Sequence, residues 1–345
     1  MKEDVWFEAA RLLPPEPARK LLVKALSRMS TSKKLWMQMA NMEKEKDMRV
    51  KTLRKALTCI SNDVDLWKAA VELEEPEEAK KLLYKAIECV PHDTGIWIAL
   101  AKLEDYRNAR KVLNQAAKKI PTDHTLWVHA AKLEEAEGKY EIVPKLIQKG
   151  IKNLKGAAKH NSVGRESVKI TRDQWLKEAY EAELSQSIVT ARAIIKETLY
   201  EGIEDKQDQE ENKKIWFEIA ENLLSRGAIE CSRALLLCVC KELRDDDEAW
   251  MKAITLEKQH GNNKTLGNIL KLALQGCDQQ ELFFLMYAKH LWKKENNIDE
   301  AINILKKGLD KLEDEEELYL ALVKLYKEKR MFTEARRLLM KGRKN

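Results

Sequence analysis

The chain has 345 residues, of which 35% are charged and 44% are hydrophobic, and its formal net charge is +6. This balance is too apolar for a disordered chain, and no run approaches the roughly 20 apolar residues of a membrane span. Only 12 glycines and 7 prolines are present, which argues against a β-sandwich. The composition therefore favours an all-α protein, while the mild positive charge does not choose between protein and RNA partners.

An aromatic residue, usually tryptophan, recurs at a regular interval along the chain. Successive tryptophans are 30 or 31 residues apart from Trp6 to Trp127, and wider intervals follow. The whole series consists of Trp6, Trp36, Trp67, Trp97, Trp127, Trp175, Trp216, Trp250, Phe284 and Tyr319. Self-similarity at this period is typical of a solenoid in which each repeat is one helix-turn-helix unit. We therefore predict an all-α superhelix of about ten such repeats, with the aromatic residues in its core.

The third repeat shows the two helices of a unit most clearly. Its first helix is expected over 67–74, where Trp67 and Ala70 share one face. Its second helix is expected over 79–87, and Pro76 lies where that helix can begin.

Small residues and prolines mark the second helices of the third and fourth repeats. Ala86 and Ala116 fall on the predicted buried face, where a small residue lets neighbouring helices approach and leaves room for the tryptophan. Pro91 and Pro121 come directly after these helices, where the chain must stop being helical.

Two stretches interrupt the repeats and define the expected organisation. Residues 154–172 are glycine-containing and polar and are predicted to form an inter-repeat loop, and 202–212 form a second, charged one. Residues 1–153 are then repeats one to five, which are shorter, and 173–345 are repeats six to ten. Because the pattern begins and stops at the ends of the chain, we expect a fragment of a longer protein.

Chemical motifs are not found. The sequence has no phosphate-binding glycine loop, no paired-histidine metal motif and no nucleophile elbow, and its six histidines are scattered. Cys231, Cys238 and Cys240 are interpreted as core thiols rather than metal ligands. Six cysteines in a chain of this length indicate free thiols in a reducing compartment. We expect no enzyme, no metal, no cofactor and no small-molecule substrate.

A glutamate follows the aromatic residue by seven positions in five repeats. These residues are Glu43, Glu74, Glu104, Glu134 and Glu257. Since each repeat contributes one, a hydrogen bond that locks neighbouring repeats, or a solvated helix end, is favoured over acid–base catalysis.

The second helices offer long polar side chains beside their apolar stripe. We predict that they line a concave groove for a partner, with Lys81, Lys85 and Lys111 as its contact residues and the 154–172 loop at its edge. For any one of these lysines a solvated helix face is the simpler interpretation, so the prediction concerns the group.

The repeat unit resembles the half-a-TPR (HAT) repeat more than the tetratricopeptide repeat. Where a tetratricopeptide unit has glycine and tyrosine, four and seven residues after its tryptophan, this chain has residues such as Ala101 and Glu104. The segments 66–79, 100–114 and 120–136 are similar to the pre-mRNA-processing factor six family of HAT-repeat RNA-processing scaffolds. The resemblance covers nearly the whole chain and is strongest from Trp36 to Glu137.

This resemblance implies a nuclear protein that acts in pre-mRNA splicing. It implies a non-catalytic scaffold that bridges the parts of the spliceosomal tri-snRNP by holding several snRNP proteins, with RNA contact secondary. The alternative is a HAT-repeat array of another class, either one that binds RNA directly or a cleavage-and-polyadenylation scaffold that forms homodimers.

Overall fold

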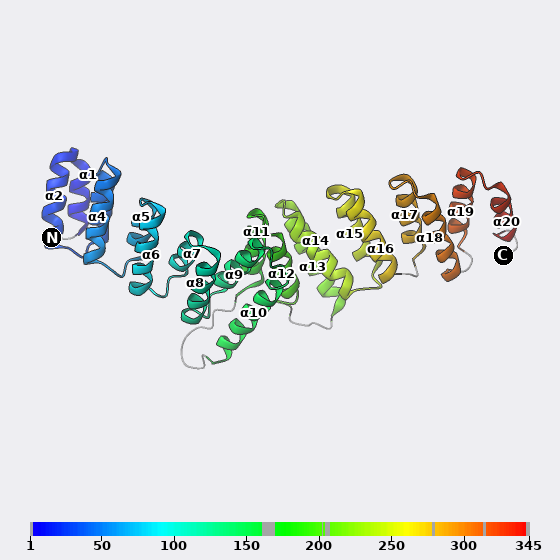
Figure 1. Cartoon of the computed structure of the whole chain (residues 1–345), viewed down its shortest axis with the longest axis horizontal. Helices are drawn as coiled ribbons and strands as arrows, with labels where there is room; N and C mark the ends of the chain where they lie inside the picture. The colour runs from blue at the N-terminus through cyan, green and yellow to red at the C-terminus, as the bar shows by residue number, and fades with distance from the viewer. Residues whose placement is uncertain are drawn as a thin grey trace. The chain divides into compact units, whose positions relative to one another are not determined.

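The computed structural model describes residues 3–160, 170–201, 203, 208–277, 280–312 and 315–342, without the side chains of 156–160 and 341–342. Within these residues the chain forms twenty α-helices and no strand, and the helices follow one another as antiparallel pairs (Figure 1). The all-α class predicted from the tryptophan spacing is confirmed. The chain divides into two compact units, Met1–Ile170 and Thr171–Asn345.

Unit 1 contains the first five helix pairs. Its helices are α1 (Glu3–Leu12), α2 (Pro15–Arg28), α3 (Lys33–Met42), α4 (Lys46–Cys59), α5 (Val64–Glu72), α6 (Pro76–Cys89), α7 (Thr94–Leu103), α8 (Tyr106–Lys119), α9 (His124–Ala136) and α10 (Val143–His160). Odd-numbered helices are the first helices of the repeats and even-numbered ones the second helices.

Unit 2 contains the remaining five pairs. Its helices are α11 (Arg172–Leu184), α12 (Ile188–Glu197), α13 (Gln209–Ser225), α14 (Ile229–Glu242), α15 (Asp247–His260), α16 (Asn263–Gly276), α17 (Glu281–Lys293), α18 (Ile298–Lys311), α19 (Glu316–Glu328) and α20 (Phe332–Gly342).

Recurring residues set the ends of the helices in unit 1. Asp63, Asp93 and Asp123 cap the N-termini of α5, α7 and α9, each with a carboxylate that accepts backbone N–H groups of the first turn. At the other end, the backbone N–H that follows α6 bonds to the carbonyl of Ala86, and the one that follows α8 bonds to Ala116. The next residues, Pro91 and Pro121, cannot extend these helices.

The aromatic series lies where the repeats meet. Nine of its ten members are buried, from Trp6 to Phe284, and Tyr319 is half-buried. Four of the indole N–H groups donate to the carbonyl six residues earlier, in the turn that precedes the first helix: Trp36 to Ser30, Trp67 to Ser61, Trp97 to Pro91 and Trp250 to Arg244, at 2.8–3.0 Å. Each of these tryptophans therefore fixes the turn between two repeats as well as filling the core.

Trp127 departs from this pattern. Its indole N–H is buried and has no hydrogen-bond partner, and nothing in the structure explains the missing bond. The Lys149 ammonium lies 5.8 Å from the centroid of its ring, and Gly150 abuts the ring from α10.

Buried small residues recur near the C-terminal ends of the second helices, and glycines there abut the aromatic residue of their own repeat, as Gly308 abuts Phe284. Ala86 and Ala116 are fully buried. In the fifth repeat glycine takes this place, since a Cβ on Gly150 would lie 2.7 Å from Trp127. In α16 the place is held by Ala273, and Gly276, three residues further on, abuts Trp250, where a Cβ would lie 2.6 Å from the ring. The helices of these repeats approach too closely for any side chain.

The predicted 154–172 loop is wrong at its beginning. Helix α10 continues to His160, because the segment 151–160 holds a single glycine among alanine, lysine and leucine, which favour a helix. Residues 161–169 lie outside the described part of the chain, and α11 begins at Arg172. The predicted 202–212 loop is likewise shorter, since α13 begins at Gln209 with Asp208 as its N-cap. The assignment of repeats to 1–153 and 173–345 stays a prediction.

Replacement of Trp97 by alanine should lower the free energy of unfolding by about 3–5 kcal/mol, as a large-to-small change in a packed core. The ring is 3% exposed and anchors the turn at Pro91. Because each repeat contacts its neighbours, hydrogen exchange should quicken in α5 to α9 and remain unchanged in unit 2. Equal loss of protection in both units would contradict this local effect.

Replacement of Gly150 by alanine should destabilise the chain by about 1–3 kcal/mol, although alanine is the better helix former. The new methyl would meet Cγ and Cβ of Trp127, which the backbone holds in place. The matched control is Gly95→Ala in α7, where a Cβ would have no ring or backbone atom among its nearest neighbours, which are the capping oxygen of Asp93 at 3.1 Å and the flexible end of Lys68 at 3.2 Å. Urea unfolding should show no loss for the control, and equal effects of the two changes would refute the close approach.

Candidate interaction surface

Each of the first four second helices packs against the first helix of its own repeat and the first helix of the next one. Helix α2 contacts α3, α4 contacts α5, α6 contacts α7 and α8 contacts α9. These contacts leave successive second helices separated by a first helix, which forms the floor between them.

The recurring glutamates join neighbouring repeats. Each accepts a hydrogen bond or ion pair from the second helix of the preceding repeat: Glu43 from Arg19, Glu74 from Arg54, Glu104 from Tyr84, Glu134 from Arg110 and Glu257 from Arg233. Of the two alternatives, the repeat-locking hydrogen bond is confirmed. We call these five contacts the inter-repeat locks.

The lock at Glu134 is the most buried of those in unit 1. Its side chain is 3% exposed, and its carboxylate accepts from Arg110 Nε at 3.0 Å and from the Tyr106 hydroxyl at 2.9 Å. Lys139 lies over the Tyr106 ring, 4.1 Å from its centroid. One carboxylate thus ties α8 to α9 across the repeat boundary.

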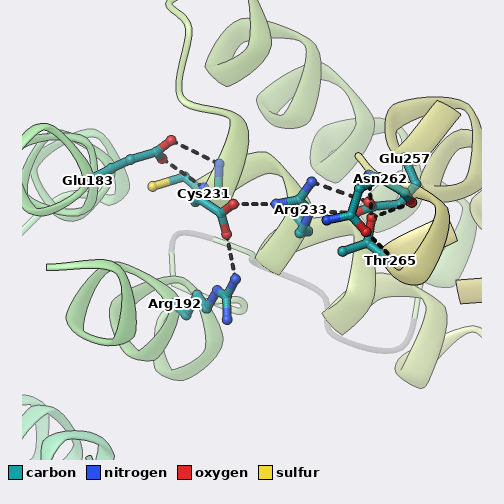
Figure 2. A network of polar contacts seen from close by, with 8 residues as sticks. Glu183, Arg192, Cys231, Arg233, Glu257, Asn262 and Thr265 are labelled. Atoms are coloured by element: carbon teal, nitrogen blue, oxygen red, sulfur yellow. Dashed lines mark hydrogen bonds and ion pairs between the residues drawn. The ribbon is translucent and has the colours of Figure 1, made fainter. Parts of the chain in front are cut away.

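In unit 2 a lock becomes part of a longer polar network (Figure 2). Glu183 of α11 accepts the backbone N–H groups of Glu230 and Cys231, both at 2.9 Å, and so caps the start of α14. Glu230 also pairs with Arg192 at 2.5 Å and with Arg233.

Arg233 extends the network to α15 through Glu257, beside the Asn262–Thr265 capping box of α16 (Figure 2). Burial lowers the pKa of the Arg233 guanidinium, but its hydrogen bond and ion pair with Glu257 outweigh this and raise the pKa. The polar groups of the network are engaged with one another, so its role is to hold four helices in register.

The cysteines are free thiols. Burial, with the hydrogen bond to Glu183, raises the pKa of Cys231, and burial raises that of Cys240 to about 12. Among the described residues no group of three or more histidine, cysteine or acidic side chains is placed to hold a metal ion. In the same part of the chain no helix is long and apolar enough to cross a membrane.

A double row of lysines runs along the second helices of unit 1. One row lies five residues before the buried small residue and consists of Lys20, Lys51, Lys81, Lys111 and Lys145; the other lies one residue before it and consists of Lys24, Lys55, Lys85 and Lys149, with Gln115 in α8. All nine lysines are exposed. We call these rows the lysine lanes.

The lanes have little acidic charge beside them except on α6. Helices α8 and α10 contain no acidic residue, α2 and α4 contain one each, and α6 contains Glu77, Glu78 and Glu88. Most of the lane lysines have no acidic partner among the described residues; Lys81 pairs with Glu78 at 2.7 Å within α6. The second helices of unit 1 therefore present an excess of free positive charge that the near-neutral total hides.

A cavity of about 430 Å³ opens between the second helices α2 and α4. Its lining comes mainly from α4 and from the end of α3, and Arg19 is the residue that α2 contributes. The lining residues are Arg19, Trp36, Met39, Glu43, Met48, Lys51, Thr52, Arg54, Lys55 and Thr58. Lysines of both lanes thus lie at a hollow with methionine side chains in its wall.

The residues predicted for the partner groove occupy equivalent places on the next two second helices. Lys81 and Lys85 are in the register of Lys51 and Lys55, and Lys111 follows in α8. Sequence reasoning missed Lys51 and Lys55, although counting back from Ala56 as from Ala86 would have found them. The sequence signal for these lysines is their position five residues and one residue before the buried alanine of the same helix.

Stacked helix pairs, a buried aromatic residue in nearly every repeat and locks between repeats define a helical-repeat scaffold of the HAT class. No family model matches the chain. Pre-mRNA-processing factor 6 of Homo sapiens is 41% identical over 251 residues, which are 73% of this chain and 25% of that protein. Pre-mRNA-splicing factor prp1 of Schizosaccharomyces pombe is 34% identical over 141 residues, 41% of this chain and 14% of that protein. The chain belongs to this HAT-repeat family of pre-mRNA-processing factors.

A plant protein is also similar to the chain. Protein STABILIZED1 of Arabidopsis thaliana is 46% identical over 211 residues, 59% of this chain and 20% of that protein. The chain spans a quarter or less of the length of these curated relatives. Among solved structures, a chain of the complex of Naa15/Naa10 bound to HypK-THB is similar over 100% of this chain and 63% of that chain. The sequence identity is 14% and the TM-score is 0.30, so this similarity carries no argument.

Replacement of Arg110 by alanine should cost about 1–3 kcal/mol of stability, because it removes a charged partner from a buried carboxylate. The control is Lys177→Ala, whose pair with Glu181 is exposed and spans 3.8 Å within α11, and whose loss should cost about 0.5 kcal/mol or less. Both changes end in alanine, so helix propensity changes alike in urea unfolding. Equal effects would show that the lock at Glu134 adds no stability.

Proposed function

We propose that the chain is a non-catalytic protein–protein interaction scaffold in pre-mRNA splicing, which acts in the nucleus and bridges protein components of the tri-snRNP. The observation that carries the proposal is the pair of lysine lanes on locked helix pairs in a chain of this family. The names of the relatives, which are splicing and pre-mRNA-processing factors, support the process.

The locks suit such a role physically. A docking surface that extends over several repeats keeps its spacing only if the repeats are held in register. Carboxylates such as Glu134 and Glu257 are 3% and 6% exposed and are engaged between repeats, so they serve rigidity. Partners then meet a preformed surface and lose less entropy on binding.

Protein partners are favoured over RNA. Base stacking on exposed aromatic rings is the usual basis of single-strand binding, and the tryptophans of the series are buried. We place the protein-docking groove at Lys81, Lys85 and Lys111, and RNA contact is secondary.

Simultaneous replacement of Lys81, Lys85 and Lys111 by glutamate should reduce the recovery of tri-snRNP proteins from nuclear extract. Helical signal and melting temperature should stay nearly unchanged, because exposed substitutions usually shift stability by about 0.5 kcal/mol or less. Quantitative mass spectrometry of the recovered proteins is the measurement.

A second triple variant controls for total charge. Lys214, Lys271 and Lys307 are exposed in unit 2, and their replacement by glutamate changes the net charge equally. It should retain the proteins that the first variant loses. Recovery of every tri-snRNP protein at the wild-type level by the folded first variant would exclude the groove over the third and fourth repeats.

A further inference from the structure

We infer that the cavity between α2 and α4 binds an extended acidic peptide segment, which inserts an apolar side chain between Met39 and Met48 and places carboxylates against Lys51 and Lys55. This inference rests on the proposed scaffold function and adds the chemistry of the partner and a first anchoring point. It concerns residues on the second repeat, one repeat before the predicted groove.

The apolar part of the inference comes from the cavity walls. Met39 and Met48 are half-buried, and Trp36 beneath them is 8% exposed. The methionine side chains are flexible and polarizable, so they adapt to aliphatic or aromatic groups of different shape. A volume of about 430 Å³ lies at the small end of ordinary ligand pockets and suits one or two side chains.

The acidic part comes from which cations at the cavity are free. Arg19 is paired with Glu43, and Arg54 with Glu74 and Glu78. Lys51 and Lys55 line the same cavity, are exposed, and have no acidic partner among the described residues. Their ammonium groups, one helical turn apart on α4, remain available to carboxylates of a ligand.

The distribution of charge favours a peptide over an RNA strand. Among the lining residues the Glu43 carboxylate is paired with Arg19, which leaves Lys51 and Lys55 as the free charges. Two cations match two carboxylates of a peptide more closely than they match a phosphate at every nucleotide. A peptide can place apolar residues at Glu43 and acidic residues at the lysines. The cavity also presents thioethers and lysine stems instead of an open aromatic face for stacking a base.

The lanes extend this site along the chain. Lys20 and Lys24 lie on α2, and Lys81 and Lys85 continue the rows on α6. An acidic segment anchored in the cavity meets further lysines on both sides. Weak exposed pairs of this kind add up only when the segment is held by an anchor, and they are screened by salt.

The test is a titration of the whole chain with a labelled synthetic peptide in which two leucines alternate with glutamates, followed by fluorescence anisotropy. We expect saturable binding that weakens with salt and weakens about tenfold in the Lys51→Glu/Lys55→Glu variant. The control variant Lys264→Glu/Lys271→Glu on α16, where both lysines are exposed, should bind as the wild type. A peptide with glutamine for glutamate should bind at least about tenfold more weakly.

Methyl resonances of labelled methionine locate the site. The Met39 and Met48 signals, assigned by single leucine replacements, should move when the peptide is added, and a peptide of glutamates and serines should leave them in place. This readout stays valid if the double lysine variant is unstable. Movement of other methionine signals instead would overturn the assignment of the cavity.

A single-stranded oligouridine is titrated in parallel. If it binds more tightly than the peptide and loses affinity in the Lys51→Glu/Lys55→Glu variant, the site is an RNA site and the inference is wrong. If the peptide fails to bind while the Lys81, Lys85 and Lys111 variant still loses tri-snRNP proteins, the partner chemistry is wrong and the scaffold proposal stands. If the peptide binds at the cavity and the Lys81, Lys85 and Lys111 variant retains all tri-snRNP proteins, the scaffold proposal is wrong and the peptide site stands.

Discussion

Two short antiparallel helices cannot enclose a tryptophan by themselves, and the rest of this structure depends on that constraint. A helix pair of this length has one apolar stripe per helix, and a ring beside a small residue such as Ala86 or Ala116 still has an open side. The next repeat closes it, so every repeat is stable only against its neighbours. The indole N–H groups of Trp36, Trp67 and Trp97 also donate to carbonyls of the preceding turns. The same residue therefore fills the core and holds the turn between two repeats.

The charged residues of unit 1 divide into two groups with different tasks. Cations such as Arg19 and Arg110 form ion pairs with the glutamate of the next repeat, in the inter-repeat locks. The lane lysines lie one residue further along the same helices, about 100° around the axis, and point away from those glutamates. A nearly neutral chain therefore carries a basic face, because α2, α4, α8 and α10 contain few acidic residues to offset the lysines on them.

The repeat number, the helix pairing and the buried aromatic series could be predicted, because a fixed period directly records stacked units. The locks could be stated only as one of two alternatives, since Glu134 and Glu104 look alike in sequence while their partners, Arg110 and Tyr84, occupy slots a turn apart. The end of α10 was missed because one glycine was given more weight than the surrounding helix formers. The α2–α4 cavity could not be predicted, because it depends on how far two helices separate.

That separation also explains why α12 and α14 of unit 2 carry no lysine in the register of the row that contains Lys145. In unit 2 the second helices α12 and α14 contact each other directly. Counting 23 residues from Trp175 and Trp216, as from Trp127 to Gly150, reaches Thr198 and Val239. Five residues earlier, where Lys145 lies relative to Gly150, are Ala193 and Ala234. Both alanines are buried, at 5% and 7% exposure. A lysine there would put a charge inside a helix interface, at a cost that no partner within that apolar contact offsets. The same register is therefore core in α12 and α14, where the second helices touch, and a cationic surface in unit 1, where a first helix lies between them.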